Sequence, residues 1–96
     1  MIEARKYPRS TIPGMEASLN DQGAWGSVLN ISQGGMLLQV PTKAELPTIG
    51  SMKKIRMRLL GKEIPLSVDG EVLRIQSGCV AIKFSKIIDL SRAIAG

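Results

Sequence analysis

The sequence predicts an all-β fold, a small antiparallel β-barrel with a short C-terminal helix. Short apolar runs recur along the chain with polar residues in alternate positions, which is the two-residue period of half-buried strands. Turns that contain glycine separate these runs, as is typical of small barrels. The 96 residues, 44% of them hydrophobic, suffice for one domain with a single modest core.

The first 14 residues differ from the rest of the chain. They are polar and basic, and Pro8, Pro13 and Gly14 interrupt them, so they favour an extended segment over a strand or helix. We therefore divide the chain into a flexible N-terminal arm, residues 1–14, and a barrel domain, residues 15–96.

Three short strands are expected at the start of the barrel domain. Turn-forming residues at 20–23 separate the first strand from the second, and a small polar turn at Ser32–Gly35 separates the second from the third. Pro41 ends the third strand, and residues 42–50 are expected to form a loop. The expected strands are Ala17–Leu19, Trp25–Ile31 and Met36–Val40.

The fourth expected strand, Met52–Leu60, has the clearest alternation in the chain. Apolar residues occupy one set of alternate positions and basic residues the other, which places the apolar set on the core. The apolar set is Ile55, Met57 and Leu59, and the basic set is Lys54, Arg56 and Arg58.

A long strand and a short one are expected next. The turn Gly61–Lys62 leads into an alternation that continues to Gln76, with Gly70 expected to mark a bend or bulge. Pro65 is expected at an edge or strand start, because proline cannot donate to a sheet. The turn Ser77–Gly78 leads into a strand over Val80–Phe84.

The last segment, Asp89–Ala95, has the spacing of one or two helical turns. Asp89 is a candidate N-cap, and Leu90 and Ile94 share one face. A helix here would plug one end of the barrel.

Composition excludes several kinds of chemistry. The chain has no His and a single Cys, so we expect no histidine-based catalysis, no internal disulfide and no zinc–thiolate cluster. No glycine-rich phosphate loop is present, and the carboxylates are scattered. We therefore predict no enzyme, no metal and no resident cofactor, and interpret Cys79 as a small hydrophobic residue.

Charge and hydropathy indicate the partners and the compartment. The formal charge of +5 favours anionic partners. No apolar run reaches the roughly 18–20 residues of a membrane span, and no signal peptide is recognisable. A cytoplasmic location is the expectation, and Met1 favours a stand-alone adaptor.

Two clusters carry the functional signal. Arg5-Lys6-Tyr7-Pro8-Arg9 lies in the arm, and Asn30-Ile31-Ser32-Gln33-Gly34-Gly35 lies between two apolar runs. Arginine suits bidentate recognition of phosphate oxygens and of the guanine O6/N7 edge. Asn and Ser beside glycines supply short hydrogen-bonding groups that a ligand can approach closely. Together the clusters predict a site for an anionic guanine compound.

These residues resemble the PilZ domain, a bacterial receptor for cyclic di-GMP. Arg5 and Arg9 match its R-x-x-x-R arm, and Asn30, Ser32 and Gly35 match its [D/N]-x-S-x-x-G segment. The later stretch Gly70-Glu71-Val72-Leu73-Arg74 is similar to the family's G-x-V-x-R pattern. The resemblance implies a six-stranded split barrel.

The resemblance also implies how the ligand is bound. It implies that Arg5 and Arg9 reach the guanine edge and phosphates, and that Asn30 and Ser32 hydrogen-bond a guanine. Gly35 would permit the turn and leave room for the nucleotide. Lys6 and Arg74 are auxiliary candidates. The resulting protein would change conformation on binding and signal to a protein partner of unknown identity.

Other interpretations of the same residues stay open. A small basic barrel can bind RNA or DNA, although such barrels stack bases on aromatic side chains and aromatic residues make up only 3% here. A PilZ-like fold can also act purely as a protein-interaction module. Asn30 and Ser32 can serve as turn formers, and Trp25 either stacks on a base or packs into the fold.

Overall fold

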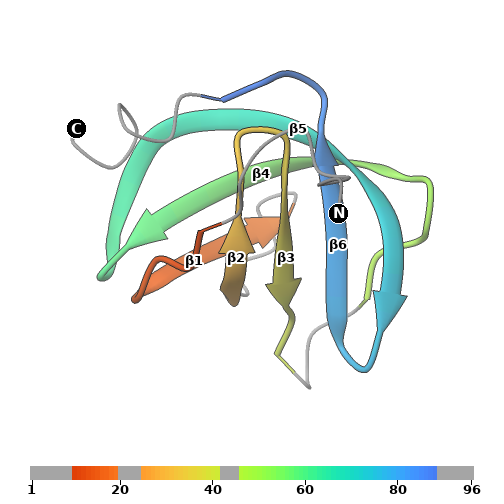
Figure 1. Ribbon diagram of the computed structural model, residues 1–96, viewed down its shortest axis with the longest axis horizontal. Helices are drawn as coiled ribbons and strands as arrows, with labels where there is room; N and C mark the ends of the chain where they lie inside the picture. Colours follow the sequence, from red (N-terminus) through yellow and green to blue (C-terminus); the bar gives the residue numbers. More distant parts are fainter. Residues whose placement is uncertain (1–9, 20–24, 42–45, 89–96) are drawn as a thin grey trace, which may run out of the picture.

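The computed structural model describes residues 10–19, 25–41 and 46–88, which form a closed barrel of six antiparallel strands in the order β1-β2-β3-β6-β5-β4 (Figure 1). The expected all-β barrel is confirmed, and each expected strand is present with small shifts at its ends. The strands are β1 (Met15–Leu19), β2 (Gly26–Ile31), β3 (Gly35–Gln39), β4 (Met52–Leu59), β5 (Lys62–Gln76) and β6 (Cys79–Phe84).

Two of the hairpin turns use backbone conformations that favour glycine. Leu60 and Gly61 join β4 to β5 with φ of 52° and 80°, and Ser77 and Gly78 join β5 to β6 with φ of 52° and 78°. Two successive residues with positive φ make the type I′ turn that matches the twist of antiparallel strands. The second turn falls where the sequence predicts it, and the first lies one residue before its predicted position, Gly61–Lys62.

The long strand β5 joins the two halves of the barrel. Residues 62–71 pair with β4, and residues 70–76 pair with β6, so the strand curves along the whole barrel wall (Figure 1). Pro65 falls at a register shift between β5 and β4, where it has no paired residue, and β5 pairs with β6 only from Gly70 onward. Pro65 thus lies at an edge, as expected, where the missing N–H leaves no sheet hydrogen bond unmade.

Gly70 was expected to mark a bend or a bulge, and of these two the bulge is absent. Gly70 lies where β5 passes from pairing with β4 to pairing with β6. Gly70 pairs in register with Lys53 on one side and Phe84 on the other. A Cβ there would lie 2.5 Å from the Ile82 Cγ2 atom and 2.7 Å from the Ile55 Cδ1 atom, so core side chains fill the space and exclude a larger residue. The register shift in this part of β5 lies three residues further on, between Val72 and Arg74.

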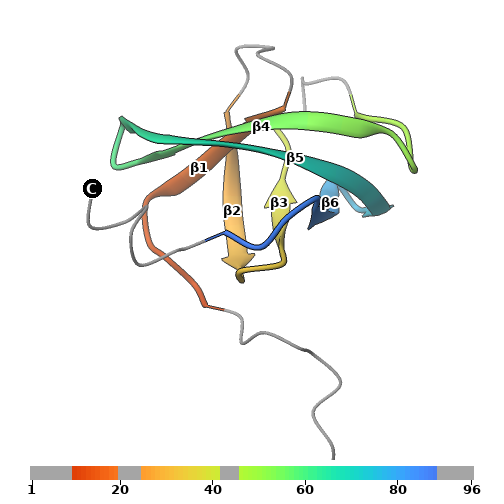
Figure 2. The same ribbon diagram turned by 90° about the horizontal axis from the view of Figure 1, so that it is seen from above.

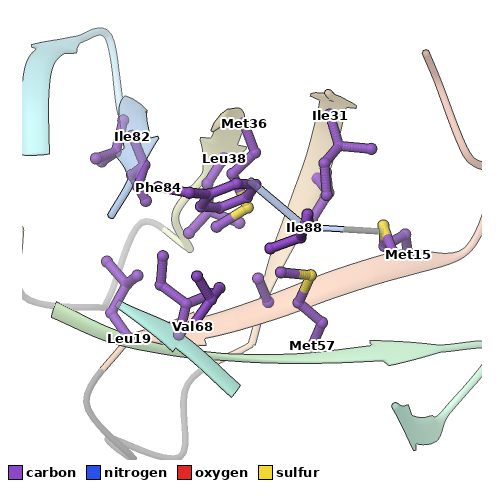
Figure 3. Close-up of a cluster of buried hydrophobic side chains, with 14 of the residues drawn as sticks. Met15, Leu19, Ile31, Met36, Leu38, Met57, Val68, Ile82, Phe84 and Ile88 are labelled. Carbon is purple, nitrogen blue, oxygen red and sulfur yellow. The ribbon is translucent and has the colours of Figure 1, made fainter. Parts of the chain in front are cut away.

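The core inside the barrel is aliphatic apart from Phe84. All six strands contribute, and Ile88, which follows β6, joins them with 3% of its surface exposed (Figure 3). The expected helix at residues 89–95 lies outside the described residues, and the described part of the chain contains no helix. Within that part, Ile88 packs into the core at the barrel end where the helix was expected. No described helix is long and apolar enough to cross a membrane.

Candidate functional site

The segment with the Asn-x-Ser-x-x-Gly pattern forms the tight turn between β2 and β3. The Ser32 N–H donates to the Gly35 carbonyl at 2.8 Å. The Ser32 hydroxyl accepts from the Gly34 N–H at 3.2 Å and lies 3.4 Å from the Gly35 carbonyl oxygen, to which it donates. Ser32 is buried, so its hydroxyl stabilises the turn, as the turn-former interpretation predicts. The Gly34 N–H uses one of the two acceptor lone pairs of that hydroxyl.

Gly35 is required for a reason that the sequence did not indicate. Gly35 begins β3 and pairs with Lys83, and its φ is not in the left-handed region that glycine favours. A Cβ at this position would overlap the carbonyl oxygen of Ile82 on the neighbouring strand β6. Glycine is therefore required by the close approach of two backbones. Its cross-strand neighbour Lys83 is exposed.

A β-bulge in β2 turns Asn30 toward the outside of the barrel. Val28 pairs with Leu38 and Asn30 pairs with the next residue of β3, Leu37, so Leu29 is an extra residue. In a regular strand Asn30 would face inward with Val28, because alternate residues share a face. The extra residue shifts the alternation of inward and outward side chains by one position. Ile31 is therefore buried and Asn30 is only half-buried.

A second bulge, in β5, turns Arg74 toward the outside of the barrel. Val72 pairs with Ile82 and Arg74 pairs with Ala81, so Leu73 is the extra residue. Val72 is buried and Arg74 is exposed. Both bulges fall in the pattern Val-Leu-polar-Ile, at residues 28–31 and 72–75. This repeated pattern is a signal for the two bulges that the sequence analysis missed.

The two bulges place Asn30 and Arg74 in one row across the outer surface of four strands. Asn30 is paired with Leu37, Leu37 with Ala81, and Ala81 with Arg74. Neighbouring strands lie about 4.8 Å apart, so the row spans about 14 Å along the sheet. Its two ends are polar and its middle is apolar. Lys83 lies two residues from Ala81 on the same face of β6, and the sequence analysis did not identify it.

The described end of the arm pairs directly with this region. Ser10 and Ile31 exchange two backbone hydrogen bonds, each 2.8 Å long. Ile31 stands between Asn30 and Ser32 in the sequence, and Ser10 directly follows Arg9. Successive Cα atoms are about 3.8 Å apart, so the arginine motif ends one residue from a contact with the Asn–Ser turn. Arg5, Lys6 and Arg9 themselves lie outside the described residues.

An open hollow of about 450 Å³ borders the described end of the arm. β1 and β2 share only the pairs that begin at Glu16 and Ala17, so the two strands separate beyond these residues. The hollow lies where they separate, between the arm residues Thr11–Gly14, the bulge at Leu29 and the Leu60–Gly61 turn. It thus adjoins both the arm and the bulge that precedes Asn30.

Trp25 belongs to a different surface, at the opposite end of β2 from Asn30. The Arg58 guanidinium carbon lies 4.3 Å from the centre of the Trp25 ring, and the Arg58 Nε is 2.7 Å from the Glu16 carboxylate. The neighbouring Arg56 donates from Nε to Glu63 at 3.0 Å. Trp25 is half-buried against these side chains, which favours the packing interpretation. No group of three or more His, Cys, Asp or Glu among the described residues is arranged to hold a metal.

Comparisons with known proteins agree with this geometry. The family model described as "PilZ domain" matches residues 3–94, nearly the whole chain. No curated protein matches the sequence. The chain is similar to the solved structure of the uncharacterized Legionella protein Lpg0364, with 20% identity and a TM-score of 0.61, over 83% of this chain and 78% of that one.

A second solved structure is more similar in shape. It is the inhibitor of motility MotI/DgrA of Bacillus subtilis, with 19% identity and a TM-score of 0.70, over 95% of this chain. The match covers 47% of the Bacillus protein, so this chain spans about half of its length. At these identities, both structures support the fold of the chain and nothing more specific.

Proposed function

The chain belongs to the PilZ domain family, and from this premise we propose that it is a cytoplasmic cyclic di-GMP receptor that changes conformation on binding and signals to a partner protein. PilZ domains form a family of cyclic di-GMP receptors and are binding modules rather than enzymes. The ligand carries two phosphodiester charges and two guanines, so it needs cationic groups together with groups that recognise guanine edges.

One observation carries the proposal. The two hydrogen bonds between Ser10 and Ile31 join the end of the arm to the strand residue between Asn30 and Ser32. Arg9 directly precedes Ser10 in the sequence, so the arginine motif ends one residue from the strand that carries Asn30 and Ser32. This closeness supports a ligand that uses both arginines and neutral hydrogen-bonding groups.

Each candidate residue has an assigned role in this proposal. Arg5 and Arg9 contact guanine edges and phosphates from the arm, and Lys6 adds a cation. Asn30 faces outward on its bulge and hydrogen-bonds a guanine. Arg74, at the other end of the same row, supplies a second contact across the apolar middle of the row. The Ser32 hydroxyl accepts a hydrogen bond from the ligand. Gly35 lets strands β3 and β6 approach each other at the edge of the site.

The conformational change takes place in the arm. The arm residues 10–14 touch the barrel through the Ser10 bridge, a weak 3.4 Å bond from the Thr11 hydroxyl to the Leu29 carbonyl, and a 3.0 Å bond from the Leu60 N–H to the Gly14 carbonyl. Ile12 also packs against the core. The open hollow lies beside them. A ligand held by Arg5, Arg9 and Asn30 adds contacts between the arm and the barrel, and so shifts the arm toward a bound position that a partner can recognise.

Calorimetric titration with cyclic di-GMP, GMP and a short single-stranded RNA tests the proposal. We expect saturable binding of cyclic di-GMP, with GMP binding at least roughly tenfold more weakly because it lacks the second guanine contact, worth about 1–3 kcal/mol. Preference for the RNA would instead support the nucleic-acid interpretation. No binding of any of the three would support a pure protein-interaction module.

A pair of arginine variants locates the site. Arg9→Ala should abolish most of the binding, whereas Arg56→Ala, on the surface that carries Trp25, should leave it unchanged. Arg56 is a matched control because it is also a partly exposed arginine of the same chain. Equal losses in the two variants would indicate a non-specific charge effect and contradict the proposed site.

A further inference from the structure

The turn between β2 and β3 is held by the chain segment that follows it in space, residues 84–88, which we call the closing segment. The Phe84 N–H donates to the Gly34 carbonyl at 2.8 Å, and the Ile88 N–H donates to the Gln33 carbonyl at 2.9 Å. Figure 2 shows this segment leaving β6 and running past the ends of β3 and β2. Two neighbouring carbonyls of the turn thus accept hydrogen bonds from one short stretch of chain.

Two side chains of the closing segment lie in the core. Phe84 is 4% exposed and Ile88 is 3% exposed, and Ile88 lies near Met15, Ile31 and Met57 (Figure 3), whereas its neighbour Ile87 is 59% exposed. The start of the segment is fixed to β5 by the pairing of Phe84 with Gly70 and by a bond from the Ser85 N–H to the Asp69 carbonyl at 2.7 Å. The end of the segment depends on Ile88, so the burial of Ile88 bears most directly on the hydrogen bond that the Gln33 carbonyl accepts.

The arm and the closing segment hold the same short region of the chain. Ser10 pairs with Ile31, the residue before Ser32, while the closing segment pairs with Gln33 and Gly34. We propose that Ile88 is a positioning residue of the ligand site: when it is buried, the closing segment holds residues 32–35 in the geometry that the ligand requires. This inference depends on the proposed function.

Thermodynamic linkage requires that ligand binding and the burial of Ile88 affect each other equally. If the ligand binds more tightly when Ile88 is buried, then the bound ligand must stabilise the buried state of Ile88 by the same factor. A partner that withdraws Ile88 from the core would then release the ligand, and the ligand would oppose that partner. Ligand binding and the burial of Ile88 are thereby coupled, so a partner that acts on Ile88 also changes the affinity for the ligand.

Calorimetric titration of three variants, at two neighbouring isoleucines, tests the proposal. Ile88→Ala should weaken cyclic di-GMP binding by a factor in the range of about 5 to 150 that is typical of coupled sites. Ile87→Ala is the matched control, because the same atoms are removed one residue away at an exposed position, and should bind like the unaltered protein. Ile88→Leu keeps an apolar side chain of equal size and should restore most of the affinity.

The outcomes separate this inference from the proposed function. Unchanged or tighter binding in Ile88→Ala, with the unaltered protein binding normally, would overturn the inference and leave the receptor function intact. No binding by the unaltered protein would overturn both. Equal losses in Ile88→Ala and Ile87→Ala would overturn the inference, because only one of these side chains is buried.

Amide exchange of the unaltered protein tests the same coupling without any substitution, and so does not depend on the folding of a variant. Cyclic di-GMP should slow exchange of the Ile88 and Phe84 N–H groups by at least about fivefold. The Gly50 N–H, which donates to Val72 at 2.7 Å away from the turn, serves as the reference and should change much less. Equal protection of all three amides would show only global stabilisation by the ligand and would overturn the inference.

Discussion

Substituting Ser10 by proline removes the contact that joins the arm to the candidate site. The Ser10 N–H donates to the Ile31 carbonyl at 2.8 Å, and the Ile31 N–H donates back at the same distance. Proline has no N–H, so Ser10→Pro eliminates the first bond and weakens the second. The Ser10 side chain is exposed, so little else in the described structure depends on it.

The expected size of the effect follows from these two bonds. A backbone hydrogen bond contributes about 0.5–1.5 kcal/mol net, so losing one and weakening the other should cost the attached arm about 1–2 kcal/mol. If the attached arm is the state that binds cyclic di-GMP, affinity should fall roughly tenfold, since about 1.4 kcal/mol corresponds to a factor of ten. The barrel itself should unfold at nearly the same denaturant concentration, because the bridge lies outside its six strands.

Calorimetric titration and urea unfolding of three proteins provide the test. Ser10→Ala is the control, because it removes the hydroxyl but keeps both backbone bonds, and it should match the unaltered protein in both assays. Ser10→Pro should lose affinity and keep its unfolding midpoint. Equal affinity in Ser10→Pro and Ser10→Ala would refute the argument that this bridge brings the arm to the site.

Four other substitutions test separate parts of the account. Arg9→Lys should lose nearly as much affinity for cyclic di-GMP as Arg9→Ala, because lysine cannot make the planar two-bond contact with guanine. Unchanged affinity of the lysine variant in calorimetric titration would contradict bidentate recognition. Asn30→Ala should lose less binding free energy, about 0.5–1.5 kcal/mol, because the hydrogen bonds of its amide are neutral. A larger loss than that of Arg9→Ala would contradict the roles assigned to these two residues. Gly35→Ala should lower the free energy of unfolding by about 1–3 kcal/mol, since the added methyl group would overlap the Ile82 carbonyl oxygen. An unchanged urea midpoint would show that β3 and β6 can move apart without a loss of stability. Ser77→Asn should raise the thermal midpoint by relieving about 0.5–1 kcal/mol of strain at φ of 52°, whereas a lower midpoint would contradict the type I′ assignment.

The strands and turns were predictable because they depend on local patterns. Alternation over Met52–Leu60 predicted β4, which ends one residue earlier, and the glycines at 61 and 78 marked both type I′ turns. The sequence also predicted that Pro65 lies at an edge. Each of these features is determined by residues adjacent in the chain.

Features that depend on contacts between distant strands were not predictable in the same way. Gly35 was expected to permit the turn and leave room for the nucleotide, and the structure adds that a Cβ there would overlap the Ile82 carbonyl oxygen on β6. Gly70 was expected to mark a bend or a bulge, whereas the bulge lies at Leu73 and core side chains fill the space beside Gly70. In both cases the reason for the glycine could be found only by knowing which residues lie opposite it.

The candidate site shows the same division. The motif residues were identified from the sequence, yet the row from Asn30 to Arg74 depends on strand order and on two bulges. The pairing of Ser10 with Ile31 is likewise a contact between residues 21 positions apart. Lys83 was missed because only the pairing of β3 with β6 places it opposite Gly35.

The most direct test of the central claim is to follow the backbone amide spectrum of the protein during titration with cyclic di-GMP. The account predicts that the largest shifts occur at Ser10, Ile31 and Gly35, where the arm and the turn meet, and at Arg74 across the outer row. Amides of Arg56 and its neighbours in β4 should shift little. Shifts concentrated on β4, with Ser10 and Ile31 unaffected, would contradict the claim that the arm and the Asn–Ser turn form one ligand site.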